Sequence, residues 1–190
     1  MTDKLLDYCS KYIQLTESDI DAIKLYFRVI KLRRKDFLLR EGKVCDFVAF
    51  VNSGVIRHYY LKDGNEITCD ITLAQTFITD YRSLVENTPS NYYFQILRDA
   101  ELLYIKKREL FELYNKHKNI ESFGRIMAEQ VALRMIEIAM SLSSEKPRER
   151  VEKLIKQRPD LFQAVPQRYL ANLLGISPES LSRIRARQKP

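Results

Sequence analysis

The chain has 190 residues and a formal net charge of +7, with 45% hydrophobic and 11% aromatic residues. This composition indicates a globular protein with one sizeable core and a small second module, and it excludes a chain that is mainly disordered. No apolar stretch approaches the length that spans a bilayer, so no membrane partner is expected. The first residues contain neither a basic segment nor a continuous apolar run, so no signal peptide is predicted and a cytoplasmic location is expected.

The N-terminal residues are predicted to be helical as far as about Leu32. Thr16 is suited to cap a helix, and Asp19 follows at the position of the capping-box acid. The apolar residues after this cap recur at helical spacing, and they are Ile20, Ile23 and Phe27.

A period of two residues replaces the helical period after this point. Short runs rich in β-branched and aromatic residues predict strands at residues 37–39, 47–51, 55–60, 67–71, 92–96 and 101–105. Turn-forming residues separate them at 41–43, 52–54 and 63–65, and the second and third of these turns have the composition of tight hairpins. Short strands at near-regular spacing predict an antiparallel barrel or roll. The helical period returns at Lys107.

A long helix is predicted from about Asn119 to Leu142. It carries more apolar residues than one face of a barrel covers, so a second copy of the chain is expected on its other side. Phe123, Met127 and Val131 are the predicted dimer contacts. The alternative is a helix that is buried wholly within one subunit. Residues 143–147 break the helical pattern and are predicted to form a hinge, and a short amphipathic helix follows from Arg148 to Lys156 and ends at Pro159.

The last residues, from Gln167 to Lys189, predict two helices joined by a tight turn. Gly175 ends the first helix, Ser177 is a good N-cap for the second, and Pro178 takes its first position. Ala171 is small enough for the two helices to cross closely, which is the spacing of a helix-turn-helix.

Nearly all the excess charge lies in the same part of the chain. From residue 147 to the end there are ten Lys and Arg residues against four Asp and Glu, a surplus of +6, whereas residues 1–146 have 22 against 21, or +1. Concentrated positive charge is what binding to a phosphate backbone requires, so double-stranded DNA is the predicted partner. The alternative is an ordinary helical hairpin with a solvated basic face.

The order of these elements resembles the cyclic-AMP receptor protein/Fnr superfamily of transcription regulators (Crp/Fnr). The resemblance covers nearly the whole chain and depends on LLREGKVCDFVAFVNSGVIRHYYLKDGNEI and YLANLLGISPESLSRIR. It implies an α+β fold with a sensor β-roll at 1–117, a dimerisation helix at 118–143 and a helix-turn-helix domain at 147–190. It also implies a homodimer that binds an inverted repeat, with RNA polymerase as a further partner.

The same resemblance assigns residues to DNA recognition. Glu179 and Arg183 match the acid and the arginine that contact base edges, since arginine binds guanine and a carboxylate accepts from cytosine. The predicted DNA-contacting set is Gln167, Arg168, Ser177, Glu179, Ser180, Arg183 and Arg187.

The sensor half departs from members of the superfamily that bind cyclic nucleotides. Those members cradle the phosphate with a glycine–glutamate turn and an arginine, but this chain has no glycine between Gly64 and Gly124, and Ser90 follows Pro89. Cyclic AMP is therefore not the expected effector, and no cofactor is predicted. Four aromatic residues could instead line an apolar effector pocket or belong to the core, and they are Phe77, Tyr81, Tyr92 and Phe94.

Two alternative functions remain open. A cupin-like barrel enzyme would hold a metal on clustered histidines, but His58 and His117 are far apart in the sequence, so no metal and no catalytic activity is predicted. A DNA-binding protein that has lost its effector is the second alternative. The cysteines, Cys9, Cys45 and Cys69, lack any metal-binding spacing; buried thiols are expected, and a redox role is left open.

Overall fold

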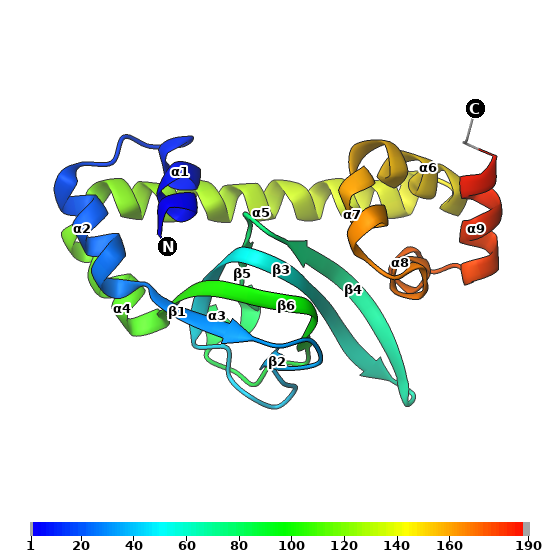
Figure 1. Cartoon of the computed structure of the whole chain (residues 1–190), viewed down its shortest axis with the longest axis horizontal. Helices are drawn as coiled ribbons and strands as arrows, with labels where there is room; N and C mark the ends of the chain where they lie inside the picture. The colour runs from blue at the N-terminus through cyan, green and yellow to red at the C-terminus, as the bar shows by residue number, and fades with distance from the viewer. Residues whose placement is uncertain (1, 188–190) are drawn as a thin grey trace.

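An antiparallel sheet, a long helix and a group of four short helices follow one another in the computed structural model, which describes residues 2–187 (Figure 1). Met1 and residues 188–190, which the predicted domains include at their outer ends, lie outside the described residues. The order of elements confirms the predicted α+β class and the antiparallel roll.

Two helices precede the sheet. They are α1 (Asp3–Ser10) and α2 (Glu17–Tyr26), and α2 begins with the predicted capping box, in which the Asp19 N–H donates to Thr16 Oγ1 over 3.2 Å. The prediction that the helical region reaches Leu32 is wrong. Residues Arg28–Leu32 form β1, because Ile30 and its neighbours pair in register with β6, and this pairing outweighs the local helical spacing.

The sheet has the strand order β1-β6-β3-β4, with β2 paired to β6 and β5 paired to β3. The bounds of its other strands are β2 (Phe37–Leu39), β3 (Phe47–Lys62), β4 (Asn65–Leu73), β5 (Phe77–Ile78) and β6 (Tyr93–Lys106). The predicted hairpin at 63–65 is confirmed, because Asp63 and Gly64 adopt φ values of 52° and 76° and join β3 to β4.

The predicted hairpin at 52–54 is wrong. The chain continues through Gly54 as one long strand, and β6 continues likewise through the expected gap between its two predicted strands. Three shifts in the β3–β6 register between Val51 and Ile56 bend the strands without ending them. Gly54 has a φ of 112°, and a Cβ there would lie 2.4 Å from the Cβ of Ala100, so the bend requires glycine.

The remaining helices are α3 (Tyr81–Glu86), α4 (Lys107–Lys116), α5 (Lys118–Ser144), α6 (Pro147–Gln157), α7 (Pro159–Ala164), α8 (Gln167–Leu174) and α9 (Pro178–Ala186). The predicted helices among them follow in the expected order, whereas α3 and α7 were not predicted. Pro159 ends α6 as predicted, but it also occupies the first turn of α7, where a missing N–H costs nothing. Helix α5 runs along the roll to the four short helices (Figure 1).

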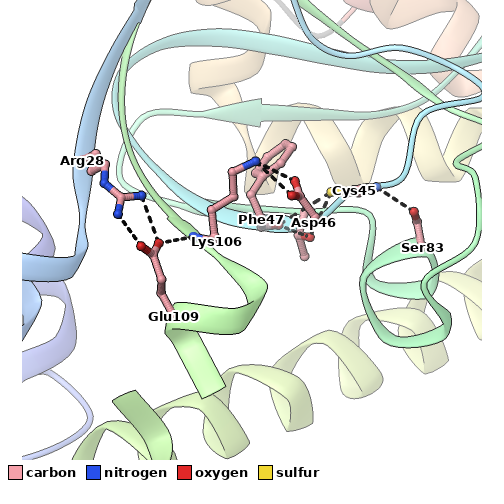
Figure 2. A network of polar contacts seen from close by, with 8 residues as sticks. Arg28, Cys45, Asp46, Phe47, Ser83, Lys106 and Glu109 are labelled. Carbon is pink, nitrogen blue, oxygen red and sulfur yellow. Dashed lines mark hydrogen bonds and ion pairs between the residues drawn. The ribbon is translucent and has the colours of Figure 1, made fainter. Parts of the chain in front are cut away.

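A polar network fixes α4 to the sheet (Figure 2). Arg28 on β1 forms an ion pair with Glu109 on α4, and the same carboxylate accepts from the Lys106 backbone N–H over 3.2 Å. The Lys106 ammonium in turn donates to both carboxylate oxygens of Asp46 over 2.9 Å. The start of β1, the end of β6 and the start of β3 are therefore held at one corner, from which α4 continues toward α5.

The cysteines differ in their surroundings. Cys9 and Cys45 are buried as expected, whereas Cys69 is exposed, so the expectation of a buried thiol is wrong there because Cys69 lies on the edge strand β4. Burial raises the pKa of Cys9 to about 12, so this thiol is protonated at neutral pH.

Candidate DNA interface and effector cavity

Helices α8 and α9 form the predicted helix-turn-helix. Gly175 adopts a φ of 66° at the end of α8, and the Ile176 N–H donates back to the Ala171 carbonyl over 3.0 Å. Ser177 caps α9, because its Oγ accepts from the Ser180 N–H over 3.2 Å. Leu181 is fully buried against α8, so the opposite side of α9 faces outward.

The residues predicted to contact DNA lie along this outward side and at the start of α8. Those that are exposed are Arg168, Ser177, Glu179, Arg183 and Arg187, while Gln167 and Ser180 are partly buried. Arg183 donates to Ser180 Oγ over 3.2 Å, which aligns its guanidinium along the surface of α9. Hydrogen bonds from its own backbone N–H and from Ser177 lower the pKa of Glu179, so the carboxylate stays ionised.

Gln167 and Arg168 are engaged within their own chain. The Gln167 side chain donates to the Pro178 carbonyl over 2.8 Å, which ties the start of α8 to the start of α9. Arg168 stacks on the ring of Tyr169, 4.6 Å from its centroid, and donates to its hydroxyl over 2.9 Å.

The helix-turn-helix packs directly on the roll, a contact that the sequence did not predict. Arg57 on β3 is 2% exposed, and its guanidinium lies 4.3 Å from the ring centroid of Tyr169 on α8 and 4.4 Å from that of Tyr59. Its Nε donates to Thr68 Oγ1 over 2.8 Å, and it also pairs with Glu66 over 2.5 Å. The arginine is therefore desolvated but fully paired, as a buried cation must be.

Further contacts surround this stacked arginine. The Thr68 backbone N–H donates to Asn172 on α8, and Arg98 on β6 donates to the Ala164 carbonyl over 3.4 Å. One apolar cluster contains Val55 and Ile71 of the roll together with Leu170 and Leu181 of the helix-turn-helix. The sequence did contain one indication, since Arg57 follows the apolar Val55 and Ile56 and precedes the aromatic Tyr59 and Tyr60 in a predicted strand.

A cavity of about 1100 Å³ lies where the roll meets α3, α4 and α5. Residues of β4, β5, α3, α4 and α5 line it, and the four aromatic residues predicted for an effector pocket, Phe77, Tyr81, Tyr92 and Phe94, all lie along it. Phe94 is fully buried beneath His58, whose ring centroid is 4.3 Å away. His58 Nε2 lies 2.8 Å from Thr72 Oγ1, and burial lowers the pKa of His58, so the imidazole is neutral.

Residues 29–117 match the family model for the cyclic nucleotide-binding domain. This part of the chain, which spans the sheet with α3 and α4, is therefore similar to that domain. No curated protein sequence matches the chain significantly. Among solved structures, the catabolite activator protein of Thermus thermophilus is 20% identical, with 91% of this chain and 83% of that chain covered and a TM-score of 0.56.

Two further structures share the fold over nearly the whole chain. The c-di-GMP-responsive global regulator CLP of Xanthomonas campestris is 16% identical, with 90% of this chain and 91% of that chain covered and a TM-score of 0.67. A CooA variant of Carboxydothermus hydrogenoformans is 19% identical, with 88% and 78% covered and a TM-score of 0.67. The resemblance to the Crp/Fnr fold is therefore confirmed.

The roll places a carboxylate at the start of α3, where a helix N-terminus could otherwise attract an anion. Asp80 is 8% exposed and caps α3, where its Oδ1 accepts from the Ser83 N–H over 3.3 Å. Ser90 is also buried, and its backbone exchanges hydrogen bonds with Gly42 and Lys43, so it has a structural role in the turn before β3. Neither residue supplies positive charge for a phosphate.

Every cation that lines the cavity already has a partner. Four form ion pairs, which are Arg82–Glu86, Arg125–Glu129, Arg134–Asp70 and Arg158–Asp160. The fifth, Lys107, donates to the Val85 carbonyl over 3.3 Å. Within residues 2–187, the lining therefore consists mainly of apolar side chains, neutral hydrogen-bonding groups and ion pairs, with Lys107 as a cation that has a hydrogen bond but no ion pair.

The three residues predicted for a dimer contact have different surroundings. Phe123 is 7% exposed and packs against Tyr8, Tyr12 and Phe77 of its own chain. Met127 is partly buried, whereas Val131 is 44% exposed. The free apolar surface of α5 begins at Val131 and continues through Leu133, Met135, Ile136, Ile138, Met140 and Leu142.

Histidines and acidic residues do not cluster at metal-binding spacing. The part of the chain that the structure describes contains no group of three His, Cys, Asp or Glu side chains that could hold a metal ion. No helix within residues 2–187 is both long enough and apolar enough to cross a membrane.

Proposed function

We propose that this protein is a sequence-specific DNA-binding transcription regulator of the Crp/Fnr type and not an enzyme. The observation that carries the proposal is the outward face of α9, where Glu179, Arg183 and Arg187 are exposed on the most basic part of the chain. A recognition helix with an ionised carboxylate and an arginine fork can discriminate base pairs in the major groove.

The working form is a cytoplasmic homodimer joined along α5. Seven large apolar side chains from Val131 to Leu142 are exposed in one chain. Four of them share one face of the helix at heptad spacing and form a stripe that a second copy of α5 would cover, and they are Val131, Met135, Ile138 and Leu142. A two-fold axis along α5 would present two recognition helices to successive major grooves, about 34 Å apart. RNA polymerase is the further partner that such a regulator would recruit or block.

The cavity favours a regulated protein over a constitutive DNA binder. Because its cations are paired and Asp80 occupies the start of α3, the cavity suits an uncharged, mainly apolar effector better than a cyclic nucleotide. His58 and Thr72 are the neutral groups available to orient such a molecule.

Selection of bound duplexes from random DNA tests the proposal. The expected product is an inverted repeat whose half-sites are centred about one helical turn apart. Recovery of no enriched motif, or of a single unpaired half-site, would refute a dimeric, sequence-specific regulator.

A further inference from the structure

The roll contains a second hollow, which lies apart from the cavity described above. It is a groove of about 410 Å³ lined by β1, β2, the β2–β3 connection and the end of β6, and its described lining residues are all different from those of the larger cavity. Leu39 and Phe47, which are buried in the core of the roll, reach its floor. The other uncharged side chains of this groove are partly buried, and they are Ile30, Phe37, Leu38, Val44 and Tyr104.

Four charged side chains stand at the rim of the groove, and all four are exposed. The Lys106 ammonium lies 2.9 Å from both carboxylate oxygens of Asp46, so these two charges compensate each other (Figure 2). Arg40 and Lys43 differ, because within residues 2–187 neither side chain forms a hydrogen bond or an ion pair. The rim therefore adds two positive charges to an apolar floor.

Stacked rings hold one of these cations in place. The Arg40 guanidinium lies 3.9 Å from the ring centroid of Phe37, and this ring meets that of Tyr93 edge-on at 5.9 Å. Tyr93 in turn stacks on the buried ring of Tyr59 at 4.9 Å, and its hydroxyl donates to Glu41 over 3.0 Å. Because the rings fix Phe37, they also fix Arg40 at the rim, while the adjacent carboxylate of Glu41 binds a hydroxyl and not the guanidinium.

We infer that this groove is a binding site for an amphipathic monocarboxylate, whose apolar body covers the floor and whose carboxylate binds Arg40 and Lys43. An arginine fork binds a carboxylate through two parallel N–H···O bonds, and a lysine ammonium supplies a further donor. Among the described lining residues, Tyr104 alone is both polar and uncharged, so the floor suits a hydrocarbon body better than a sugar or a base. The larger cavity suits an uncharged molecule, so the two sites take different ligands.

Calorimetric titration of the full chain with decanoate, below its micellar concentration, tests the inference. The first variant, Arg40→Gln/Lys43→Gln, removes both rim charges, and the second, Arg40→Glu/Lys43→Glu, reverses them. The matched control, Arg33→Gln/Lys35→Gln, removes two exposed charges from the neighbouring β1–β2 turn, outside the lining of the groove. Decylamine, which carries a cationic group in place of the carboxylate, is titrated into the same proteins. Circular dichroism checks that each variant is folded.

Wild type and control should each bind one decanoate per chain in a saturable isotherm, and the Gln variant should bind it about tenfold or more weakly. The Glu variant should lose decanoate and gain decylamine, which a merely damaged groove would not do. Equal decanoate affinity in wild type and Gln variant would overturn the inference, because the molecule would then bind elsewhere. An equal loss in the control, a Glu variant that gains no decylamine, or a wild type without saturable binding would also overturn it. No DNA is present, so these outcomes are independent of the proposed function.

Discussion

The guanidinium of Arg57 lies between the rings of Tyr59, on its own strand, and Tyr169, on the first helix of the helix-turn-helix. The charge is buried and paired with Glu66, so both the roll and the helix-turn-helix domain contribute to its environment. This stack joins two parts of the chain that are more than a hundred residues apart.

A double-mutant cycle should detect this stack as a coupling between the two positions. Arg57→Met and Tyr169→Leu each remove one partner, and the coupling free energy of unfolding should be on the order of 1–2 kcal/mol because the cation is desolvated. Urea unfolding of the four proteins measures it. As a control, Arg168→Met removes the exposed cation that also stacks on Tyr169 and should show a smaller coupling. Additive effects of Arg57→Met and Tyr169→Leu would show that the stack does not hold the domains together.

Cyclic AMP should not bind in the cavity with useful affinity. The start of α3 is capped by the carboxylate of Asp80, and four of the five lining cations are in ion pairs, so a phosphate would find little unneutralised positive charge. Isothermal calorimetry at millimolar nucleotide should give only heats of dilution. A saturable isotherm in the micromolar range would contradict this account of the cavity.

Charged residues on the exposed apolar face of α5 should disrupt the proposed dimer contact. Val131→Asp/Ile138→Asp places two carboxylates one heptad apart on a surface that must be desolvated in a dimer, so light scattering should report monomers at low micromolar concentration. Gln130→Asp, at an exposed polar position beside Val131, should remain dimeric. If the double variant remains a dimer, the subunits associate through another surface.

Arg183 should contribute to sequence preference, whereas Arg148 should not. Arg183→Ala should weaken binding to the selected site by roughly 1–3 kcal/mol per half-site and relax the preference at one base pair. Arg148 lies at the start of α6 and pairs with Glu152, so any contact it makes with DNA should be to phosphate. Its replacement by Ala should affect specific and scrambled duplexes alike, with a salt slope lower by about one unit. An equal loss on both duplexes for Arg183→Ala would exclude a base contact.

Asp19 should make stability depend on pH in the acid range. Burial raises the pKa of this carboxyl, but hydrogen bonds from the Thr16 backbone, from Asn119, from the Thr16 hydroxyl and from His117 outweigh burial and lower it to about 2. Because the folded-state pKa lies below the ordinary value, the stabilisation is complete above about pH 4 and is lost as the pH falls toward 2.

Ionised Asp19 should contribute about 2 kcal/mol to the free energy of unfolding at neutral pH. Asp19→Asn should lower the free energy of unfolding at neutral pH and flatten its dependence on pH between about 4 and 2. Asp21→Asn, at an exposed position on the same helix, should leave the profile unchanged. A wild-type profile that is already flat across this range would show that Asp19 is not preferentially ionised in the folded protein.

The sequence correctly predicted the elements whose conformation is determined by a few adjacent residues. The Thr16 capping box, the Asp63–Gly64 hairpin and the Gly175 turn depend on a few adjacent residues, and all three are present. The predicted turn at Gly54 was wrong because the glycine serves a close approach to Ala100 on another strand, which no local pattern encodes. The contact between Arg57 and Tyr169 depends on the placement of a whole domain, so the sequence offered only an arginine in an apolar strand.

Strand β4 lies at one edge of the sheet, so one of its sides has no neighbouring strand. Helix α8 covers that edge, where the Asn172 side chain accepts from the Thr68 backbone N–H. A roll without the last four helices would present unpaired strand backbone beside the uncovered Val55 and Ile71, which is a template for strand addition by another chain. The helix-turn-helix domain therefore shields this edge, and we expect the isolated roll to self-associate unless β4 carries a polar substitution.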